Sequence, residues 1–151
     1  MAHYWIQTIM GCIGAVGFAV LFNVRGKRLV LIALASALSW LGYVLCDMSG
    51  TGLFWAIFCG TTVAGMISEV LARIVKVPVL MLLVPILIPL IPGGTLYNMM
   101  SSLVRNQHDL FLRYAQQLLV EAGAIALGII CCASVMGIFM GWQTNVSKKK
   151  M

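Results

Sequence analysis

The sequence predicts an all-α, polytopic integral membrane protein with about five transmembrane helices, the fourth of which is broken by proline and glycine. Of its 151 residues, 62% are hydrophobic and 9% are charged, whereas an ordinary soluble domain has about 45–50% and about 25%. Four acidic and ten basic residues cannot cover the surface of a soluble domain of this length. The composition therefore excludes a soluble fold, and its hydrophobicity also excludes a disordered chain.

Long apolar runs define the helices, because a helix needs roughly 20 mostly apolar residues to cross a hydrocarbon core of about 30 Å. Such runs predict helices at about 4–22, 29–46, 53–72 and 117–140. The first run has no basic segment before it, so we interpret it as a helix and not as a removable signal peptide. The connections are short, and no repeat or linker divides the chain. Residues 1–151 are therefore expected to form one membrane domain, with a basic cytoplasmic tail at 141–151.

A further segment, residues 77–104, is uncharged but carries all four prolines of the chain and a Gly-Gly pair. Either half is too short to cross a bilayer alone, at 1.5 Å per residue. Together the halves predict one span, broken at residues 92–94.

The basic residues predict the orientation, because short cytoplasmic loops carry an excess of Lys and Arg. With five spans, three clusters fall on one side of the membrane: Arg25, Lys27 and Arg28; Arg73 and Lys76; Lys148, Lys149 and Lys150. The N-terminus is then outside and the C-terminus inside. A re-entrant 77–104 segment would place the last cluster outside, so the charge balance favours a full crossing. The net positive charge thus reflects topology, and no nucleic-acid partner is expected.

Other side chains predict packing and not chemistry. The five cysteines show no metal-ligand spacing, and the two histidines are far apart in the sequence. No hydrolase, zinc-protease or nucleotide-binding motif is present. We therefore expect neither an enzyme nor a cofactor or metal. Small residues recur three or four apart in helices one, three and five, and such residues let helix backbones approach closely in lipid.

The broken segment is the candidate site. Its last three prolines remove N–H groups and should free the carbonyls of Met81, Pro85 and Ile88 on one face. Beyond the break, the N–H groups of Gly94, Thr95 and Leu96 should be unpaired, with Thr95 as N-cap, at the positive end of the helix dipole. Discontinuous helices of this kind bind anionic substrate groups in secondary transporters. The predicted substrate-binding residues are Pro92, Gly93, Gly94, Thr95, Tyr97 and Asn98. The alternative is a proline bend that serves packing alone.

Two carboxylates inside the predicted spans are proton-coupling candidates, because ionisable groups at membrane depth are costly. Glu69 can instead form an i,i+4 ion pair with Arg73. Glu121 lies about one turn into the last span, where its side chain can instead reach the membrane interface.

Several segments resemble the small-subunit type, or C-terminal membrane half, of the threonine/serine exporter family. They read AVGFAVLFNV (15–24), LSWLGY (38–43), EVLAR (69–73) and IPLIPGGTLYNMM (88–100). The most specific match is the pattern P-x-x-P-G-x-x-x-Y-x-x-M, carried by Pro89, Pro92, Gly93, Tyr97 and Met100.

The resemblance implies a bacterial inner-membrane exporter of small carboxylate-bearing metabolites, either threonine/serine-type amino acids or dicarboxylates. It also implies a partner, a larger subunit with its own membrane half and a soluble N-terminal region. An odd number of spans in each half would allow inverted pseudosymmetry. The expected partners are thus that subunit, a small-molecule substrate and the lipid bilayer. A non-transporting membrane scaffold or accessory subunit is the alternative function.

Overall fold

The described secondary structure is entirely helical. The computed structural model describes residues 2–148, and the side-chain surroundings of residues 6–138. The elements are α1 (Ala2–Leu21), α2 (Lys27–Met48), α3 (Leu53–Val75), α4 (Val79–Leu87), the short 3-10 helix η1 (Ile88–Leu90), α5 (Gly93–Val104) and α6 (His108–Lys148). The predicted all-α class and the break in the fourth helix are confirmed.

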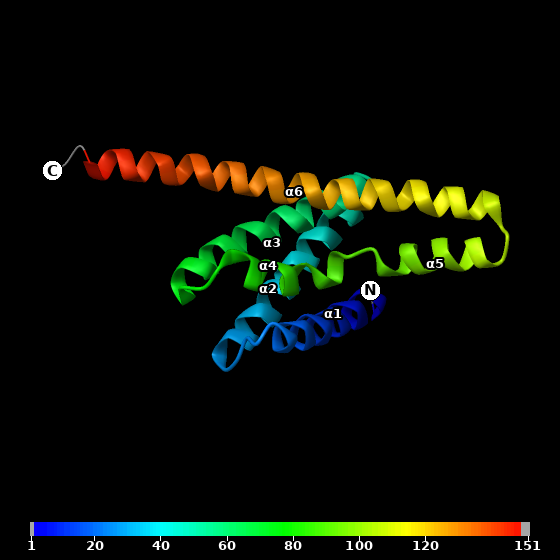
Figure 1. Cartoon of the computed structure of the whole chain (residues 1–151), viewed down its shortest axis with the longest axis horizontal. Coiled ribbons are helices and arrows are strands. Elements are labelled where there is room, and N and C mark those ends of the chain that lie inside the picture. Colours follow the sequence, from blue (N-terminus) through cyan, green and yellow to red (C-terminus); the bar gives the residue numbers. More distant parts are fainter. Residues whose placement is uncertain (1, 149–151) are drawn as a thin grey trace.

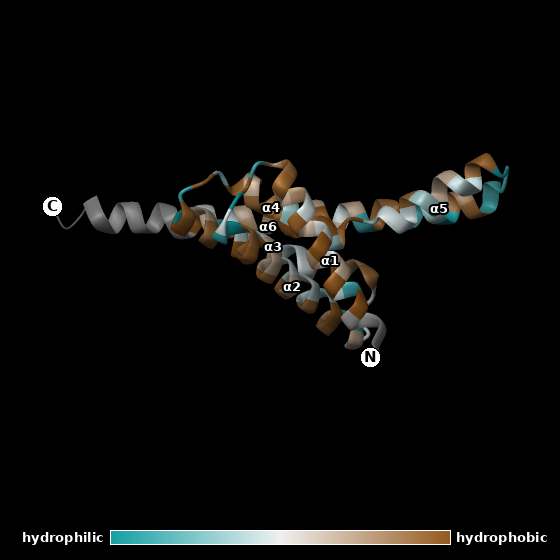
Figure 2. Ribbon diagram, turned by 90° about the horizontal axis from the view of Figure 1, so that it is seen from below, coloured by the Kyte–Doolittle hydropathy of each residue, from teal (hydrophilic) through white to brown (hydrophobic). Residues whose placement is uncertain are grey.

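The helices α1 to α4 form a bundle that packs on one side of α6 (Figure 1). Helix α3 is central, since it contacts α2, α4 and α6. Apolar residues make up most of the bundle, while hydrophilic residues gather at the α5–α6 turn and in the turns on the other side of the bundle (Figure 2). This distribution is that of a membrane domain, in which the apolar surface faces lipid.

Three helices are long and apolar enough to cross a membrane, within the described part of the chain: α2, α3 and residues His108–Ile138 of α6. The α4–η1 segment and α5 form a further candidate, bent by 60°. The apolar part of α1, Ile6–Leu21, is shorter. The chain is therefore polytopic, with three or four candidate spans by this measure, against about five expected from the sequence.

Helix α6 is longer than expected at both ends. It begins at His108 and continues through Lys148, whereas the apolar run predicted a helix at 117–140. Charged residues such as Asp109 end an apolar run without ending a helix, and an acid in the first turn is favoured by the helix dipole. At 1.5 Å per residue, α6 is about 60 Å long. Residues 141–148 of the expected tail thus continue the helix, and 149–151 lie outside the described residues.

Small residues bring α3 and α6 into close contact. A Cβ atom added at Gly128 would lie 2.9 Å from the Cβ of Thr61, and one added at Gly65 would lie 2.9 Å from the Sγ of Cys132. Helix α1 approaches the break in the same way, because a Cβ at Gly11 would lie 3.0 Å from the ring of Pro89. The predicted packing role of small residues is confirmed at these three positions.

The basic residues between Arg25 and Lys76 lie at one end of the bundle. The α1–α2 turn and the α3–α4 turn lie at that end, and α6 runs past the bundle in the same direction (Figure 1). The first two turns carry or adjoin the basic residues between Arg25 and Lys76. The fold brings the clusters at residues 25–28 and 73–76 to one end, whereas Lys149 and Lys150 of the third predicted cluster lie outside the described residues.

Candidate functional site

The break in the fourth helix lies at Ile91 and Pro92. The 3-10 helix η1 ends at Leu90, Ile91 is extended, and Pro92 is the N-cap of α5. The observed break therefore begins one residue before the predicted one. It arises because a proline cannot donate a backbone hydrogen bond and restricts the residue before it to extended conformations.

Fewer backbone carbonyls before the break are unpaired than the prolines predicted. The N–H of Ile88 donates to the carbonyl of Pro85, and the N–H of Ile91 donates to the carbonyl of Ile88 at 3.3 Å. Two of the three carbonyls that we expected to be free thus accept hydrogen bonds. The prediction of a cluster of free acceptors is therefore wrong. The tighter i→i+3 bonds of a 3-10 turn use carbonyls that an α-helix would leave unpaired.

Two N–H groups in the first turn of α5 have no backbone acceptor among the described residues. The N–H of Leu96 donates to the carbonyl of Pro92 at 3.0 Å, so Leu96 is not free as predicted. Gly94 and Thr95 occupy the second and third helical positions, whose N–H groups have no acceptor within a helix. Pro92, and not Thr95, is the N-cap. The donors expected at the helix start are therefore reduced to Gly94 and Thr95.

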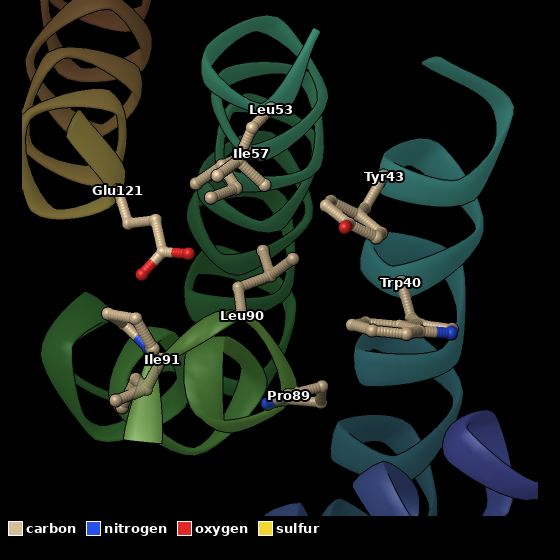
Figure 3. Close-up of a pocket in the computed structure, with 9 residues that line it drawn as sticks. Trp40, Tyr43, Leu53, Ile57, Pro89, Leu90, Ile91 and Glu121 are labelled. Atoms are coloured by element: carbon tan, nitrogen blue, oxygen red, sulfur yellow. The ribbon is translucent and has the colours of Figure 1, made fainter. Parts of the chain in front are cut away.

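A buried carboxylate lies beside this helix start. Glu121 of α6 is 5% exposed, and its Oε1 accepts hydrogen bonds from Thr95 Oγ1 at 3.1 Å and from Gln117 Nε2 at 2.9 Å. Its Oε2 is buried and has no hydrogen-bond partner among the described residues. The interpretation that Glu121 reaches out to the membrane interface is wrong, because the side chain points inward between α3 and η1 (Figure 3).

Sequence reasoning missed both contacts of this carboxylate. Thr95 and Glu121 are 26 residues apart, and no pattern in the sequence pairs them. Gln117 precedes Glu121 by one helical turn, and this i,i+4 spacing could have predicted their contact.

A cavity of about 140 Å³ adjoins the carboxylate. It lies near the N-terminal end of α3 and is lined by Trp40, Tyr43, Leu53, Ile57, Pro89, Leu90, Ile91, Pro92 and Glu121 (Figure 3). The rings of Trp40 and Tyr43 stack with centroids 4.8 Å apart. The sequence gave no signal that these two aromatic residues would face the break.

Two of the predicted site residues lie elsewhere. Tyr97 is 71% exposed and Asn98 is also exposed, whereas Thr95 on the same helix faces α6. Tyr97 lines a separate hollow on the outer side of α5, together with Met100, Ser101, Val104 and Arg105. Of the described elements, only α6 contacts α5. The structure therefore brings Pro92 and Thr95 close to the Glu121 carboxylate. Gly93 and Gly94 are exposed, and Tyr97 and Asn98 face away from the carboxylate.

The second candidate carboxylate, Glu69, forms an ion pair. Its Oε2 accepts a hydrogen bond from Arg73 Nη2 at 3.1 Å, and the two side chains are 20% and 41% exposed. Glu69 thus has its own partner one turn away on α3. Among the residues that the structure describes, no group of three His, Cys, Asp or Glu side chains is placed to hold a metal ion.

Comparison with known proteins identifies a family for this chain. No solved structure matches the chain. A family model described as "Threonine/Serine exporter" matches residues 7–135, a range that includes the helix break and the buried carboxylate. Because the match covers most of the sequence, the chain belongs to the threonine/serine exporter family.

Proposed function

We propose that the chain is the membrane subunit of a secondary exporter of small carboxylate-bearing metabolites, and that it works with a larger subunit. Membership of an exporter family and the apolar helices support a transport role. The observation that carries the site is the helix break, which leaves the N–H groups of Gly94 and Thr95 at the start of α5 beside a buried carboxylate.

In this proposal the substrate carboxylate binds the N–H groups of Gly94 and Thr95. A helix N-terminus binds anions because its unpaired N–H groups and its dipole both favour negative charge. The chain has few charged side chains that could bind a carboxylate, so backbone N–H groups are suitable donors in their place. Glu121 carries the coupled proton, since it is the buried acid at this site.

The larger subunit covers the outer face of α5. Tyr97, Met100 and Val104 are more than half exposed on that face, and α5 has no described neighbour other than α6. A second membrane half seated there would enclose the open helix start and bring Tyr97 and Asn98 into contact with the substrate.

The orientation follows from the charges. We assign the basic end of the bundle to the cytoplasm of a bacterial inner membrane, because cytoplasmic loops carry the excess of Lys and Arg. The N-terminus then lies outside, and substrate enters from the end that holds Arg25 and Lys76.

Metabolite release from cells tests the function. Cells that lack the chain and its larger partner should accumulate the substrate internally and release less of it, and restoring both subunits should reverse the change. Threonine, serine and succinate, measured inside and outside the cells by mass spectrometry, cover the substrate classes. Unchanged levels of all three would support the scaffold alternative.

Replacing Glu69 with glutamine should leave export within about fivefold of the wild type, because partly exposed ion pairs contribute only about 0.2–1 kcal/mol. Glutamine keeps a carbonyl oxygen for Arg73 and removes only the charge. Export rates at several pH values check this. A flattened pH dependence in the variant would instead assign the proton to Glu69.

A further inference from the structure

Cys46 and Cys59 are a pair of thiols that the transport mechanism above does not use. Their side chains are hydrogen-bonded to each other, although the residues belong to different helices, α2 and α3. Both side chains are partly exposed. Of the other described cysteines, Cys12 donates to a backbone carbonyl of α2 at 3.5 Å. Cys131 and Cys132 are adjacent on α6, and adjacent residues of a helix do not face each other.

Helices α2 and α3 approach each other closely where small residues meet. A Cβ atom added at Gly42 would lie 3.6 Å from the Cβ of Val63. One added at Gly60 would lie 3.1 Å from the Cβ of Tyr43, and the Oγ of Ser39 donates to the carbonyl of Gly60 at 3.0 Å. The later residue of α2 meets the earlier residue of α3, so the two helices are antiparallel.

The same register brings the two cysteines face to face. Residues four apart lie on one face of a helix. Cys46 follows Gly42 by four residues, and Cys59 precedes Val63 by four. In an antiparallel pair, one turn onward on α2 and one turn back on α3 therefore place the two thiols opposite each other. A disulfide needs a Cβ–Cβ separation of about 3.5–4.5 Å, and the separation one turn away is 3.6 Å.

The pair lies near the α2–α3 turn. Cys46 is two residues before Met48, the last residue of α2, which is about 3 Å along the helix axis. Residues 49–52 of the turn are exposed, and the hydroxyl of Thr51 donates to the carbonyl of Cys46 at 2.9 Å. In the orientation proposed above, this turn lies on the outer side of the membrane. Disulfides form and persist in that compartment.

We propose that Cys46 and Cys59 form a reversible disulfide that joins α2 to α3 and stabilises the pair of helices. The two thiols lose two protons and two electrons as the S–S bond forms. A protein or small-molecule disulfide on the outer side takes up both and becomes two thiols. Cys46, beside the exposed turn, forms the mixed disulfide with this oxidant, and Cys59 then displaces the oxidant. The inference rests on the proposed orientation and is independent of the substrate.

The disulfide fixes the spacing of two helices that line the cavity at the helix break. Tyr43 precedes Cys46 by three residues, Ile57 precedes Cys59 by two, and both line that cavity. A cross-link also restricts the unfolded chain. The oxidised protein should therefore unfold at a temperature about 5–10 °C higher than the reduced protein.

Counting free thiols tests the pair. Membranes from cells that carry both subunits are treated with glutathione disulfide or with a reducing agent, denatured, and labelled with a maleimide that adds one mass tag per free thiol. Three of the five thiols of the chain should react after oxidation, and all five after reduction. Cells quenched with acid before labelling should give three, which reports the state of the pair in the living membrane.

Serine variants assign the disulfide to these two residues. Cys46→Ser and Cys59→Ser should each give four reactive thiols whether oxidised or reduced, with the same unfolding temperature in both states. Cys131→Ser is the matched control, since it removes a thiol from α6 and keeps the pair, so oxidation should still remove two thiols. Membrane abundance reports whether each variant inserts, and the wild-type count decides the result if a serine variant does not.

The outcomes that contradict the proposal are distinct. Five reactive thiols in the oxidised wild type would overturn the disulfide, and a loss of two thiols that persists in Cys46→Ser would assign it to other cysteines. Five free thiols in quenched cells would overturn its formation on the outer side. Equal unfolding temperatures of the oxidised and reduced wild type would overturn its stabilising role. None of these results changes metabolite release, which tests the exporter function separately.

Discussion

Replacing Gly94 with leucine should reduce export by about 10-fold to 100-fold, because hydrogen bonds to a charged group contribute about 1.5–3 kcal/mol. A leucine side chain at the second position of α5 would cover the N–H groups assigned to the substrate carboxylate. The fold should tolerate it, since a Cβ atom at Gly94 meets no neighbouring atom within 4 Å. Export rate, normalised to the amount of protein in the membrane, is the measurement.

Gly137→Leu is the matched control. Gly137 also lies in a helix, and a Cβ atom there meets nothing within 4 Å, but it is far along α6 from the break. This variant should export at the wild-type rate. Normal export by the Gly94 variant would show that the substrate does not bind at the start of α5.

Replacing Gly128 with valine should destabilise the bundle by about 1–3 kcal/mol, the usual cost of overpacking a filled interior. The added Cβ atom would lie 2.9 Å from the Cβ of Thr61 and 3.2 Å from the carbonyl oxygen of Phe58. A carbonyl of the α3 backbone cannot rotate away, so α3 and α6 must separate. Thermal or denaturant unfolding of the purified chain in detergent measures the loss.

The comparison needs a valine at an open glycine of the same helix. Gly137→Val has the same cost in helix propensity, because valine is β-branched at either position, and meets no neighbour. Equal stability of the two variants would show that the α3–α6 approach at Gly128 is not tightly packed. If Gly128→Ala lowers the stability by an amount between zero and the loss caused by valine, the Cβ atom itself causes part of the strain.

The sequence was sufficient for the class of fold and for the place of the break. Membrane helices can be predicted because a bilayer demands about 20 apolar residues in a row. Pro92 and the Gly-Gly pair located the break to within one residue of Ile91, since proline acts on its own backbone and on the residue before it. The ion pair of Glu69 followed from i,i+4 spacing in the same way. All these properties depend on neighbours in the sequence.

Helix ends were harder to predict, because hydropathy reports where lipid ends and not where a helix ends. Helix α6 therefore continues past its apolar run in both directions. Which backbone N–H groups of α5 are free also depends on the local geometry of η1 and Pro92. In this geometry the N–H of Leu96 donates to the carbonyl of Pro92.

The site itself was decided by tertiary structure. Only the packing of α5 against α6 places Thr95 on Glu121, and only the approach of α2 brings Trp40 and Tyr43 to the break. The same packing turns Tyr97 away from the carboxylate. The sequence alone determined a membrane protein with a broken helix, because those features follow from composition and local backbone chemistry. The charge and shape of the candidate site depend on contacts between distant helices, which the three-dimensional fold sets.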